Sequence, residues 1–429
     1  GRTVTTWALY TPQNGALWME ANKYIDQAVR FYSEQVGEYP YASCTAVDGT
    51  ISAGGGMEYP MITIIGTMYD TFDLDVVIAH EVGHNWFQGI LATNERIHPW
   101  MDEGINSYFE QRYVEHHYAG VLFNDVQGLP VRLFNRGEGV TYRERNELQY
   151  LFNARRNQDA PLGSAATDFS MLDYGFSLYS KGPLAMDHLH SVLGAAVFER
   201  CIKAYFDTWR FRHPSPQDMR NVFEATSVQD LSWFFEGVVQ RNEKLDPQVG
   251  CRHGKRAKVR SDAEQPTPVP VRMAEAQDTV VVAGQGTPAR FTLPERHASL
   301  YVDPNARTLD INRRNNMQGD GFAAGWRRFP AVRFGTGLEQ QERSSVFWMP
   351  LVGLNAWDGW MPGLLLHNMS VPSKRLEWAL APMYGTKSER LSGGGRIEWN
   401  SDRIRSSWLR NIRYGVSGWT ASTEGLGDD

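Results

Sequence analysis

The stretch "VVIAHEVGHNWF" at residues 76–87 places two histidines and a glutamate inside an otherwise apolar run. His80 and His84 are four positions apart, so on a helix their side chains leave the same face, with Cβ atoms about 5–6 Å apart. Burying three polar side chains without partners costs on the order of 1–3 kcal/mol each. A metal ion held by both imidazoles removes that cost, and a core helix with ordinary hydrogen-bond partners is the simpler alternative.

A third metal ligand is expected further along the chain, because a hydrolytic zinc takes three protein ligands and keeps a fourth position for water. Glu103 follows His84 after eighteen intervening residues, in the segment "WMDEGINSYFE" at 100–110. HExxH, eighteen residues and a glutamate within "WMDEG" together resemble the gluzincin metallopeptidases of the aminopeptidase N family. The resemblance implies one Zn²⁺ per chain, bound by His80, His84 and Glu103.

Residues beside these ligands have the chemistry that a zinc hydrolase needs. Zinc lowers the pKa of a bound water from 15.7 to about 7. Glu81 is rotated by about 100° from His80 around a helix, so it points at the water and is the natural general base. Asp102 is predicted to orient a zinc-binding imidazole, with a helix-capping surface carboxylate as the alternative.

The segment "DYGFSLYSKGPLAMDHL" at 173–189 carries a second part of the resemblance. Tyr-x-Lys-Gly at the start of a long helix is similar to the oxyanion-stabilising segment of the family. This match implies that Tyr179 is catalytic, and Tyr174 matches a second tyrosine of some relatives. Without the resemblance, both would be read as ordinary core aromatic residues.

The segment "GGGMEYP" at 54–60 bears on where a substrate is cut. Glycines let a peptide backbone approach closely, and an adjacent carboxylate can pair with a free α-amine. The segment looks like the Gly-x-Met-Glu-Asn exopeptidase motif, with Tyr59 in place of the asparagine, which leaves the local hydrogen bonding unspecified. The substrate-binding residues that the match implies are Gly55, Gly56, Met57 and Glu58. The implied activity is removal of N-terminal amino acids.

Composition sets the outer limits of this interpretation. The chain has 429 residues, 42% hydrophobic and 21% charged, and a formal charge of -6, so it is globular in composition and gives no general reason to expect nucleic acid as a partner. Three scattered cysteines predict neither a disulfide framework nor a cysteine metal site. No stretch approaches the ~20 apolar residues of a transmembrane helix. The chain opens at Gly1 without an initiator Met or signal peptide and looks like a processed piece.

The pattern along the chain predicts an α+β fold. Residues 1–245 are expected to form a thermolysin-like catalytic domain, with a small β-rich lobe, a zinc helix beginning near Asp73 or Asp75, and helices from 103 to about 240. One amphipathic helix is expected from residue 15, ending at Gly37. A small β-sandwich is expected over 246–318.

Residues 319–429 form a Trp- and Gly-rich region that is expected to be β-hairpins. Eight of the fourteen tryptophans fall here, and aromatic, alternating segments of about ten residues are typical of outer-membrane strands. A soluble β-domain with tryptophan in its core is the alternative. The region looks similar to barrel-like extensions in some bacterial envelope relatives, which implies outer-membrane association and a periplasmic or cell-envelope location, with a cytoplasmic location as the alternative.

The function expected from the sequence is a zinc aminopeptidase that acts on peptides with a free N-terminus. Relatives usually carry a β-rich domain ahead of this region, and its absence implies weaker exopeptidase activity. One alternative is a thermolysin-like endopeptidase, against which the glycine-rich motif argues. Another is a non-catalytic envelope module, against which the intact Glu81 and Tyr179 argue. The sequence leaves the preferred N-terminal residue and the oligomeric state open.

Overall fold

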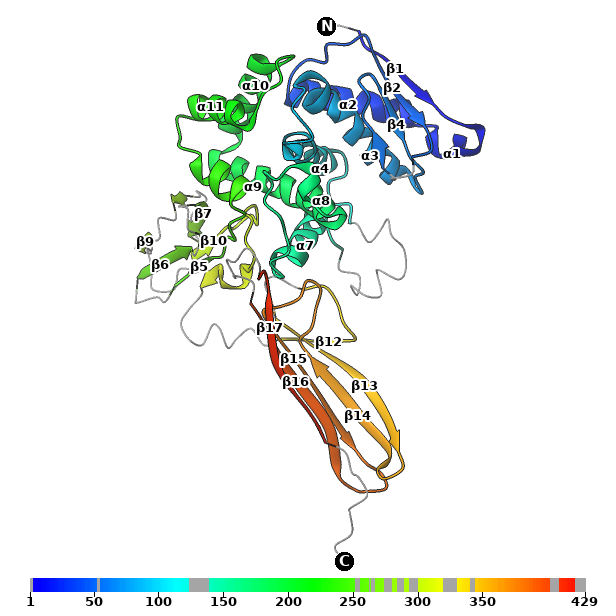
Figure 1. Cartoon of the computed structure of the whole chain (residues 1–429), viewed down its shortest axis with the longest axis vertical. Coiled ribbons are helices and arrows are strands. Elements are labelled where there is room, and N and C mark those ends of the chain that lie inside the picture. Colours follow the sequence, from blue (N-terminus) through cyan, green and yellow to red (C-terminus); the bar gives the residue numbers. More distant parts are fainter. Residues whose placement is uncertain are drawn as a thin grey trace, which may run out of the picture.

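The computed structural model describes residues 3–51, 55–122, 139–250, 255–261, 263, 267–273, 280–283, 289–292, 300–318, 330–339, 344–401 and 409–420. Figure 1 shows helices grouped in the upper part of the molecule, a small sheet at the N-terminal side, and a long sheet that extends away from the helices toward the C-terminus. Cys251 and parts of the region 246–318, where a β-sandwich is predicted, lie outside the described ranges.

The N-terminal lobe is a four-stranded sheet covered by two helices. The strand order is β1-β2-β4-β3, with the strands β1 (Thr5–Leu9), β2 (Ser43–Asp48), β3 (Gly56–Met57) and β4 (Ile62–Ile65). Strand β3 pairs antiparallel with β4 at the edge of the sheet. Helices α2 (Ala21–Gln35) and α3 (Thr71–His84) pack against each other and against these strands, so the β-rich lobe and the HExxH helix share one core.

Two helix boundaries in this lobe differ from the predicted ones. The single helix expected from residue 15 is divided into α1 (Gly15–Trp18), which follows the short turn η1 (Pro12–Asn14), and α2. The α3 helix starts at Thr71 rather than near Asp73, because the side chain of Asp70 accepts a hydrogen bond from the Asp73 backbone N–H, 2.8 Å away. An Asp at this position satisfies one of the unpaired N–H groups of the first turn.

The helical lobe follows α3 directly and confirms the helical pattern predicted from 103 to about 240. It contains, in order, η2 (Asn85–Ile90), η3 (Trp100–Gly104), α4 (Ile105–His117), α7 (Tyr142–Ala154), η4 (Ala166–Asp168), α8 (Met171–Phe176), η5 (Ser177–Lys181), α9 (Gly182–Leu193), α10 (Ala195–Trp209), α11 (Pro216–Ser227) and η6 (Trp233–Gln240). Gly194, with a φ of 76°, separates α9 from α10. One hydrophobic cluster joins both lobes.

Two small sheets follow the helical lobe. One has the order β5-β6-β9 and the other β11-β10-β7-β8. Their bounds are β5 (Pro247–Val249), β6 (Arg256–Ser261), β7 (Pro268–Met273), β8 (Val280–Ala283), β9 (Ala289–Thr292), β10 (Leu300–Val302) and β11 (Met317–Gln318), with the turn η7 (Arg313–Asn315). Val259 from the first sheet and Val271 and Leu300 from the second are buried in one cluster, so the two sheets share a core.

The C-terminal sheet has six strands in chain order. They are β12 (Ala331–Phe334), β13 (Ser345–Asn355), β14 (Gly359–His367), β15 (Leu376–Tyr384), β16 (Leu391–Ser401) and β17 (Ile412–Thr420). Strands β12 and β13 are parallel, and every later neighbour is antiparallel. Among the described residues, no helix combines the length and the apolar character needed to cross a membrane.

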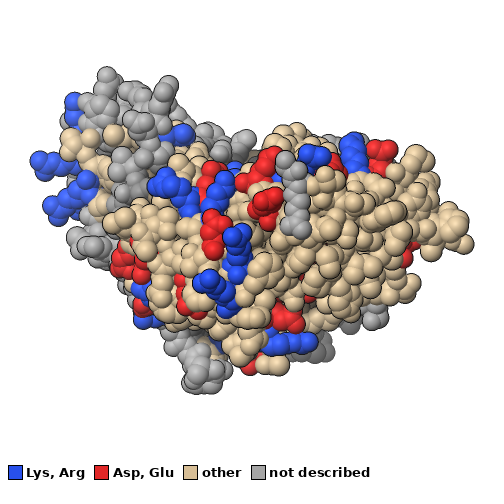
Figure 2. Space-filling view, turned by 90° about the horizontal axis from the view of Figure 1, so that it is seen from above, with Lys and Arg blue, Asp and Glu red and all other residues tan. Residues whose placement is uncertain are grey.

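Charged residues are unevenly distributed over the upper face of the molecule. Figure 2 shows basic side chains together at the left-hand end, acidic and basic side chains next to each other across the middle, and mostly uncharged residues over the right-hand part.

Candidate active site

Three potential metal ligands meet where α3 packs against η3. The Nε2 atoms of His80 and His84 lie 3.0 Å apart, and Oε2 of Glu103 lies 3.3 Å from the first and 3.4 Å from the second. His80 and His84 are buried, and Glu103 is largely buried. The structure therefore brings together the three side chains that the sequence predicts as ligands.

The other nitrogen of each imidazole is fixed by a carboxylate. His80 Nδ1 lies 2.6 Å from Glu110 Oε2, and His84 Nδ1 lies 2.7 Å from Asp102 Oδ1. An ionised carboxylate can only accept a hydrogen bond, so each Nδ1 carries a hydrogen and each Nε2 is left to face the Glu103 carboxylate. In that position each Nε2 can hold a proton or bind a metal cation through its lone pair. The donor set of two imidazoles and one carboxylate fits zinc.

The electrostatics of the cluster also favour positive charge. Burial lowers the pKa of His80, but the carboxylates of Glu103 and Glu110 outweigh burial and raise this pKa to about 10. Burial likewise opposes protonation of His84, and Asp102 and Glu103 raise its pKa well above the usual value. Carboxylates surround both rings, so the site attracts a cation in the space between them.

Glu81 lies beside the ligands and is free for chemistry. It is buried, and its Oε2 atom has no hydrogen-bond partner among the described residues. Burial raises its pKa to about 7, partly offset by the two histidines and reinforced by Glu103 and Glu58. Strand β3 passes over this carboxyl so closely that a Cβ atom on Gly56 would lie 2.3 Å from Glu81 Cδ. A side chain at this position would therefore have to displace either β3 or the Glu81 carboxyl.

A contact between two glycines brings Tyr179 to the ligands. A Cβ atom on Gly182 would lie 2.7 Å from the Cα atom of Gly104, so the backbones of η3 and α9 touch. Tyr179, one turn before Gly182, lies with its ring centroid 5.7 Å from that of His80 and is 37% exposed. Burial and the neighbouring Glu103 raise the pKa of Tyr179 well above the usual value, so its hydroxyl keeps its proton for donation.

The second predicted tyrosine, Tyr174, belongs to the same wall of the site. Its ring centroid lies 6.2 Å from that of Tyr179, and the side chain is half-buried. Burial, followed by Glu103 and Asp102, raises its pKa. Both hydroxyls are thus neutral donors at neutral pH.

The glycine-rich segment borders the cluster from the edge of the N-terminal sheet. Met57 and the half-buried Glu58 follow Gly56, and one oxygen each of Glu58, Glu95 and Asp102 lie within 4.8 Å of one another. Burial raises the pKa of Glu58. His84 partly offsets this rise, and Asp102 and Glu103 add to it. This acidic corner is suited to a cationic group of a substrate.

Sequence reasoning left the local hydrogen bonds of the 57–61 turn open, and the structure supplies them. The side chain of Asn85 accepts a hydrogen bond from the Met61 backbone N–H at 2.9 Å, and Thr63 donates to the Met57 carbonyl at 3.0 Å. Tyr59, which replaces the motif asparagine, is exposed. The asparagine that braces this turn therefore comes from the residue after the HExxH motif.

Three functional neighbours were missed by the sequence analysis. Glu110 holds His80, the hydroxyl of Tyr142 donates to Glu110, and Glu95 completes the acidic corner. Glu110 had a readable signal, because it lies seven residues after Glu103 and so two helical turns along the same face. Tyr142 had none, since its contact depends on how α7 packs on α4. The predicted role of Asp102 toward an imidazole is confirmed.

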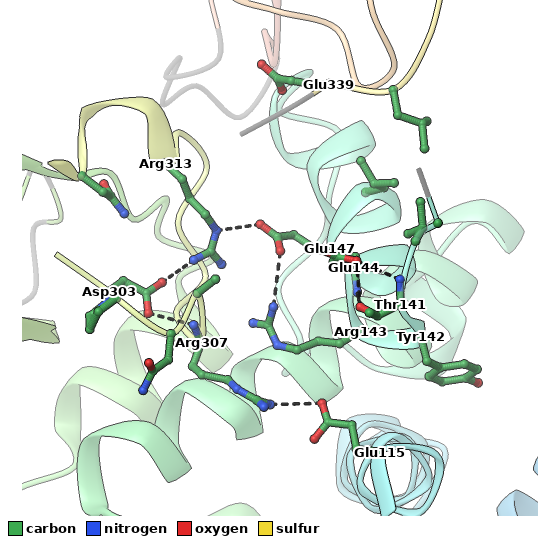
Figure 3. A pocket seen from close by; sticks show the side chains of 18 of the residues that line it. Glu115, Thr141, Tyr142, Arg143, Glu144, Glu147, Asp303, Arg307, Arg313 and Glu339 are labelled. Atoms are coloured by element: carbon green, nitrogen blue, oxygen red, sulfur yellow. Dashed lines mark hydrogen bonds and ion pairs between the residues drawn. The ribbon is translucent and has the colours of Figure 1, made fainter. Parts of the chain in front are cut away.

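A large cavity lies behind the ligand cluster rather than at it. It has a volume of about 1200 Å³, and its walls come from α4, α7 and the segments 301–317 and 333–339. Figure 3 shows how charged pairs cross it: Arg313 pairs with Glu147 at 2.7 Å, and Arg307 with Glu115 at 3.2 Å. Tyr142 connects the cavity to the site: it lines the cavity, and its hydroxyl donates a hydrogen bond to Glu110. The cavity is therefore a junction held by ion pairs, not the site that the metal ligands form.

Comparison with known proteins agrees with this site. Residues 23–237 match the model of the Peptidase family M1 domain. The chain is 28% identical over 172 residues to leucine aminopeptidase 2-1 of Meyerozyma guilliermondii, covering 37% of this chain and 25% of that protein. It is 32% identical over 199 residues to leucine aminopeptidase 2 of Candida glabrata, covering 42% and 28%. Aminopeptidase Q of Mus musculus is 27% identical over 145 residues, covering 33% and 24%.

The chain thus matches about a quarter of the length of these curated relatives. A solved structure of aminopeptidase A from Legionella pneumophila, in complex with aspartic acid, aligns with a TM-score of 0.55 at 13% identity over 71% of this chain and 36% of that one. At this identity the likeness concerns the fold alone. The matched domain spans half of the chain and contains His80, His84, Glu103 and the side chains described around them, and on this basis the chain belongs to peptidase family M1.

Proposed function

We propose that this chain is a zinc-dependent aminopeptidase. The observation that carries the proposal is the convergence of His80 Nε2, His84 Nε2 and Glu103 Oε2 next to an unpaired buried carboxyl, that of Glu81. These three atoms would hold Zn²⁺, whose Lewis acidity polarises a carbonyl and lowers the pKa of a water molecule to about 7.

The edge strand supplies a place for a peptide substrate. An extended peptide can add to the exposed edge of a sheet through main-chain hydrogen bonds, and β3 is at the edge of its sheet. Gly55 and Gly56 present no side chain to such a peptide. The oxygens of Glu58, Glu95 and Asp102 then attract the α-ammonium group of the first residue, which favours cleavage after that residue.

Two side chains of this site fit the chemical step. Glu81 takes a proton from the attacking water and passes it to the leaving amine, and a pKa of about 7 suits both transfers at neutral pH. Tyr179 donates a hydrogen bond to the oxyanion that develops on the former carbonyl. Its partial exposure on the ligand side of the cluster supports this role.

The names of the relatives support the reaction class. Several curated relatives are leucine aminopeptidases, so a leucyl amide is the first substrate to try. Because the chain matches only part of their length, activity of this chain by itself is part of the proposal.

The experiment compares hydrolysis of leucyl-aminomethylcoumarin with that of its N-acetylated twin by purified, zinc-loaded chain. Glu81→Gln is the matched variant, since it keeps the side-chain volume and removes the base. We expect only the free-amine substrate to be cleaved, and the variant to lose that activity. Equal cleavage of both substrates would contradict the role of Glu58 and indicate an endopeptidase. Zinc-loaded protein that cleaves neither would contradict the proposal for this chain.

A further inference from the structure

The C-terminal sheet separates charged from uncharged residues between its two faces. In a sheet, paired residues share a face and successive residues alternate. The register of β12 to β17 places Arg333, Glu377, Arg396, Glu398 and Arg413, which are all the Asp, Glu, Lys and Arg residues of these strands, on the same face. His367 lies on this face too, opposite Phe347. We call it the charged face.

The opposite face, which we call the uncharged face, carries large apolar side chains in contact with solvent. Its most exposed members include Val352 (67%), Leu391 (80%) and Val416 (75%). Each of the strands β13 to β17 contributes at least one exposed aromatic or aliphatic residue to it. Five strands about 4.8 Å apart and about 30 Å long give an area on the order of 700 Å², which exceeds the largest apolar patch of a typical monomer.

Aromatic residues mark both ends of the uncharged face. Trp348, Trp399 and Tyr414 lie toward the helical part of the molecule, and Trp360 and Tyr384 lie toward the far end. The row through Trp348 reaches β16 at Gly395, four residues before Trp399. Four residues of ~3.4 Å over the three steps of ~4.8 Å to Trp399 is an inclination of roughly 43°, and over the four steps to Tyr414, which pairs with Trp399, it is roughly 35°. Strands in a bilayer are tilted by about 45°.

From this arrangement we propose that the uncharged face of the C-terminal sheet contacts the acyl chains of a lipid bilayer. Strands of 9 to 11 residues have the length that crosses hydrocarbon when tilted. A protein partner would leave a polar rim around an apolar centre, whereas this face stays uncharged to its ends and finishes in tryptophan and tyrosine, the residues that favour the membrane–water interface.

The backbone imposes a condition on this contact. Acyl chains offer no hydrogen-bond partner, so a bare strand edge is excluded from hydrocarbon. Within the described residues, β17 pairs on one side only, with β16. In lipid, we therefore expect the amide hydrogens on the outer edge of β17 to become protected through pairing with further strands, which hydrogen–deuterium exchange measures.

The test is co-flotation of the full chain with vesicles of dioleoylphosphatidylcholine, which carry no net charge. We expect the wild-type chain to float with the vesicles and to remain bound in 1 M NaCl, since the contact is apolar. Val352→Arg and Leu380→Arg place a charge in the middle of the uncharged face, and each is expected to reduce the bound fraction by roughly 10-fold or more. Ser417→Arg adds the same charge to the charged face and is the matched control, expected to bind like wild type.

Other outcomes overturn the proposal. Wild-type chain that stays in the aqueous fraction as a dimer by light scattering would assign the uncharged face to a second copy. Wild-type chain that stays there as a monomer would leave the face without a lipid partner. Equal loss of binding in Ser417→Arg and Val352→Arg would mean that the two faces do not differ. Near-ultraviolet circular dichroism of each variant checks that the chain is folded.

Discussion

The ligand cluster and the C-terminal sheet distribute polarity in opposite ways. Around His80 and His84, charged side chains are buried and paired with one another. On the uncharged face of the sheet, tryptophan, leucine and valine are exposed. Burying charge is costly without a partner, and so is exposing a large apolar surface. The partners that we propose for the two regions differ accordingly: a cation between the two imidazoles in the first, and lipid acyl chains in the second.

The largest expected effect is a loss of catalysis that leaves metal binding intact. Glu81→Gln should reduce kcat for the leucyl amide by roughly 10²–10⁴-fold, because the general base is lost. Zinc content by atomic absorption should remain one per chain, since Glu81 is not among the three converging ligands. A variant that also loses zinc would show that Glu81 belongs to the cation site, and the two roles would no longer be separable.

The second largest effect is expected from adding a side chain where strand β3 passes close to Glu81. Gly56→Ala places a methyl group 2.3 Å from Glu81 Cδ, which must displace either β3 or the carboxyl, and misplacement of about 1 Å can cost 10²-fold in rate. The control is Gly175→Ala in α8, where a Cβ atom meets nothing within 4 Å. Steady-state kinetics of both variants test this, and equal activity would contradict the close approach.

The carboxylates behind the imidazoles should set the affinity for the cation. Glu110→Gln replaces the charged acceptor of His80 Nδ1 with a neutral amide and should weaken zinc binding roughly 10–100-fold. Glu115→Gln changes the same kind of residue on the same helix, where the side chain pairs with Arg307 instead. Competition with a chromophoric chelator gives both dissociation constants. Similar values for the two variants would mean that Glu110 does not tune the site.

Acid is expected to lower the free energy of unfolding through one buried carboxylate, and a single substitution should remove this pH dependence. Burial raises the pKa of Asp159, but Lys244 and Lys181 outweigh burial and lower it from 3.8 to about 2. A lowered folded-state pKa stabilises the fold above the unfolded pKa near 3.9 and loses this stability as pH falls toward 2, here roughly 2–3 kcal/mol. Urea unfolding between pH 5 and pH 2 measures the slope, which Asp159→Asn should flatten while also lowering stability at pH 7.

The sequence predicted most of what local spacing determines. Four-residue spacing puts His80 and His84 on one face of any helix, and the structure brings Glu103 to them. Helical patterning after residue 103 was likewise confirmed. The start of α3 was missed because it is decided by one hydrogen bond, which the Asp73 backbone N–H donates to the Asp70 side chain.

Contacts between distant elements could not be read in the same way. Tyr142 reaches Glu110 only because α7 packs on α4, and no local pattern encodes that packing. The alternation in β13 to β17 indicated strands, but a single strand does not say which face its neighbours share. The separation of all charge onto one face became visible only with the strand register.

The contact between Gly104 and Gly182 has a consequence for how this chain can vary. Because two backbones touch there, the spacing of the two chain segments that carry Glu103 and Tyr179 is fixed by main-chain contact. We therefore expect saturation mutagenesis to reject every side chain at Gly182, where a Cβ atom would lie 2.7 Å from Gly104 Cα, and to accept alanine at Gly104, where the nearest atom to an added Cβ is 3.5 Å away.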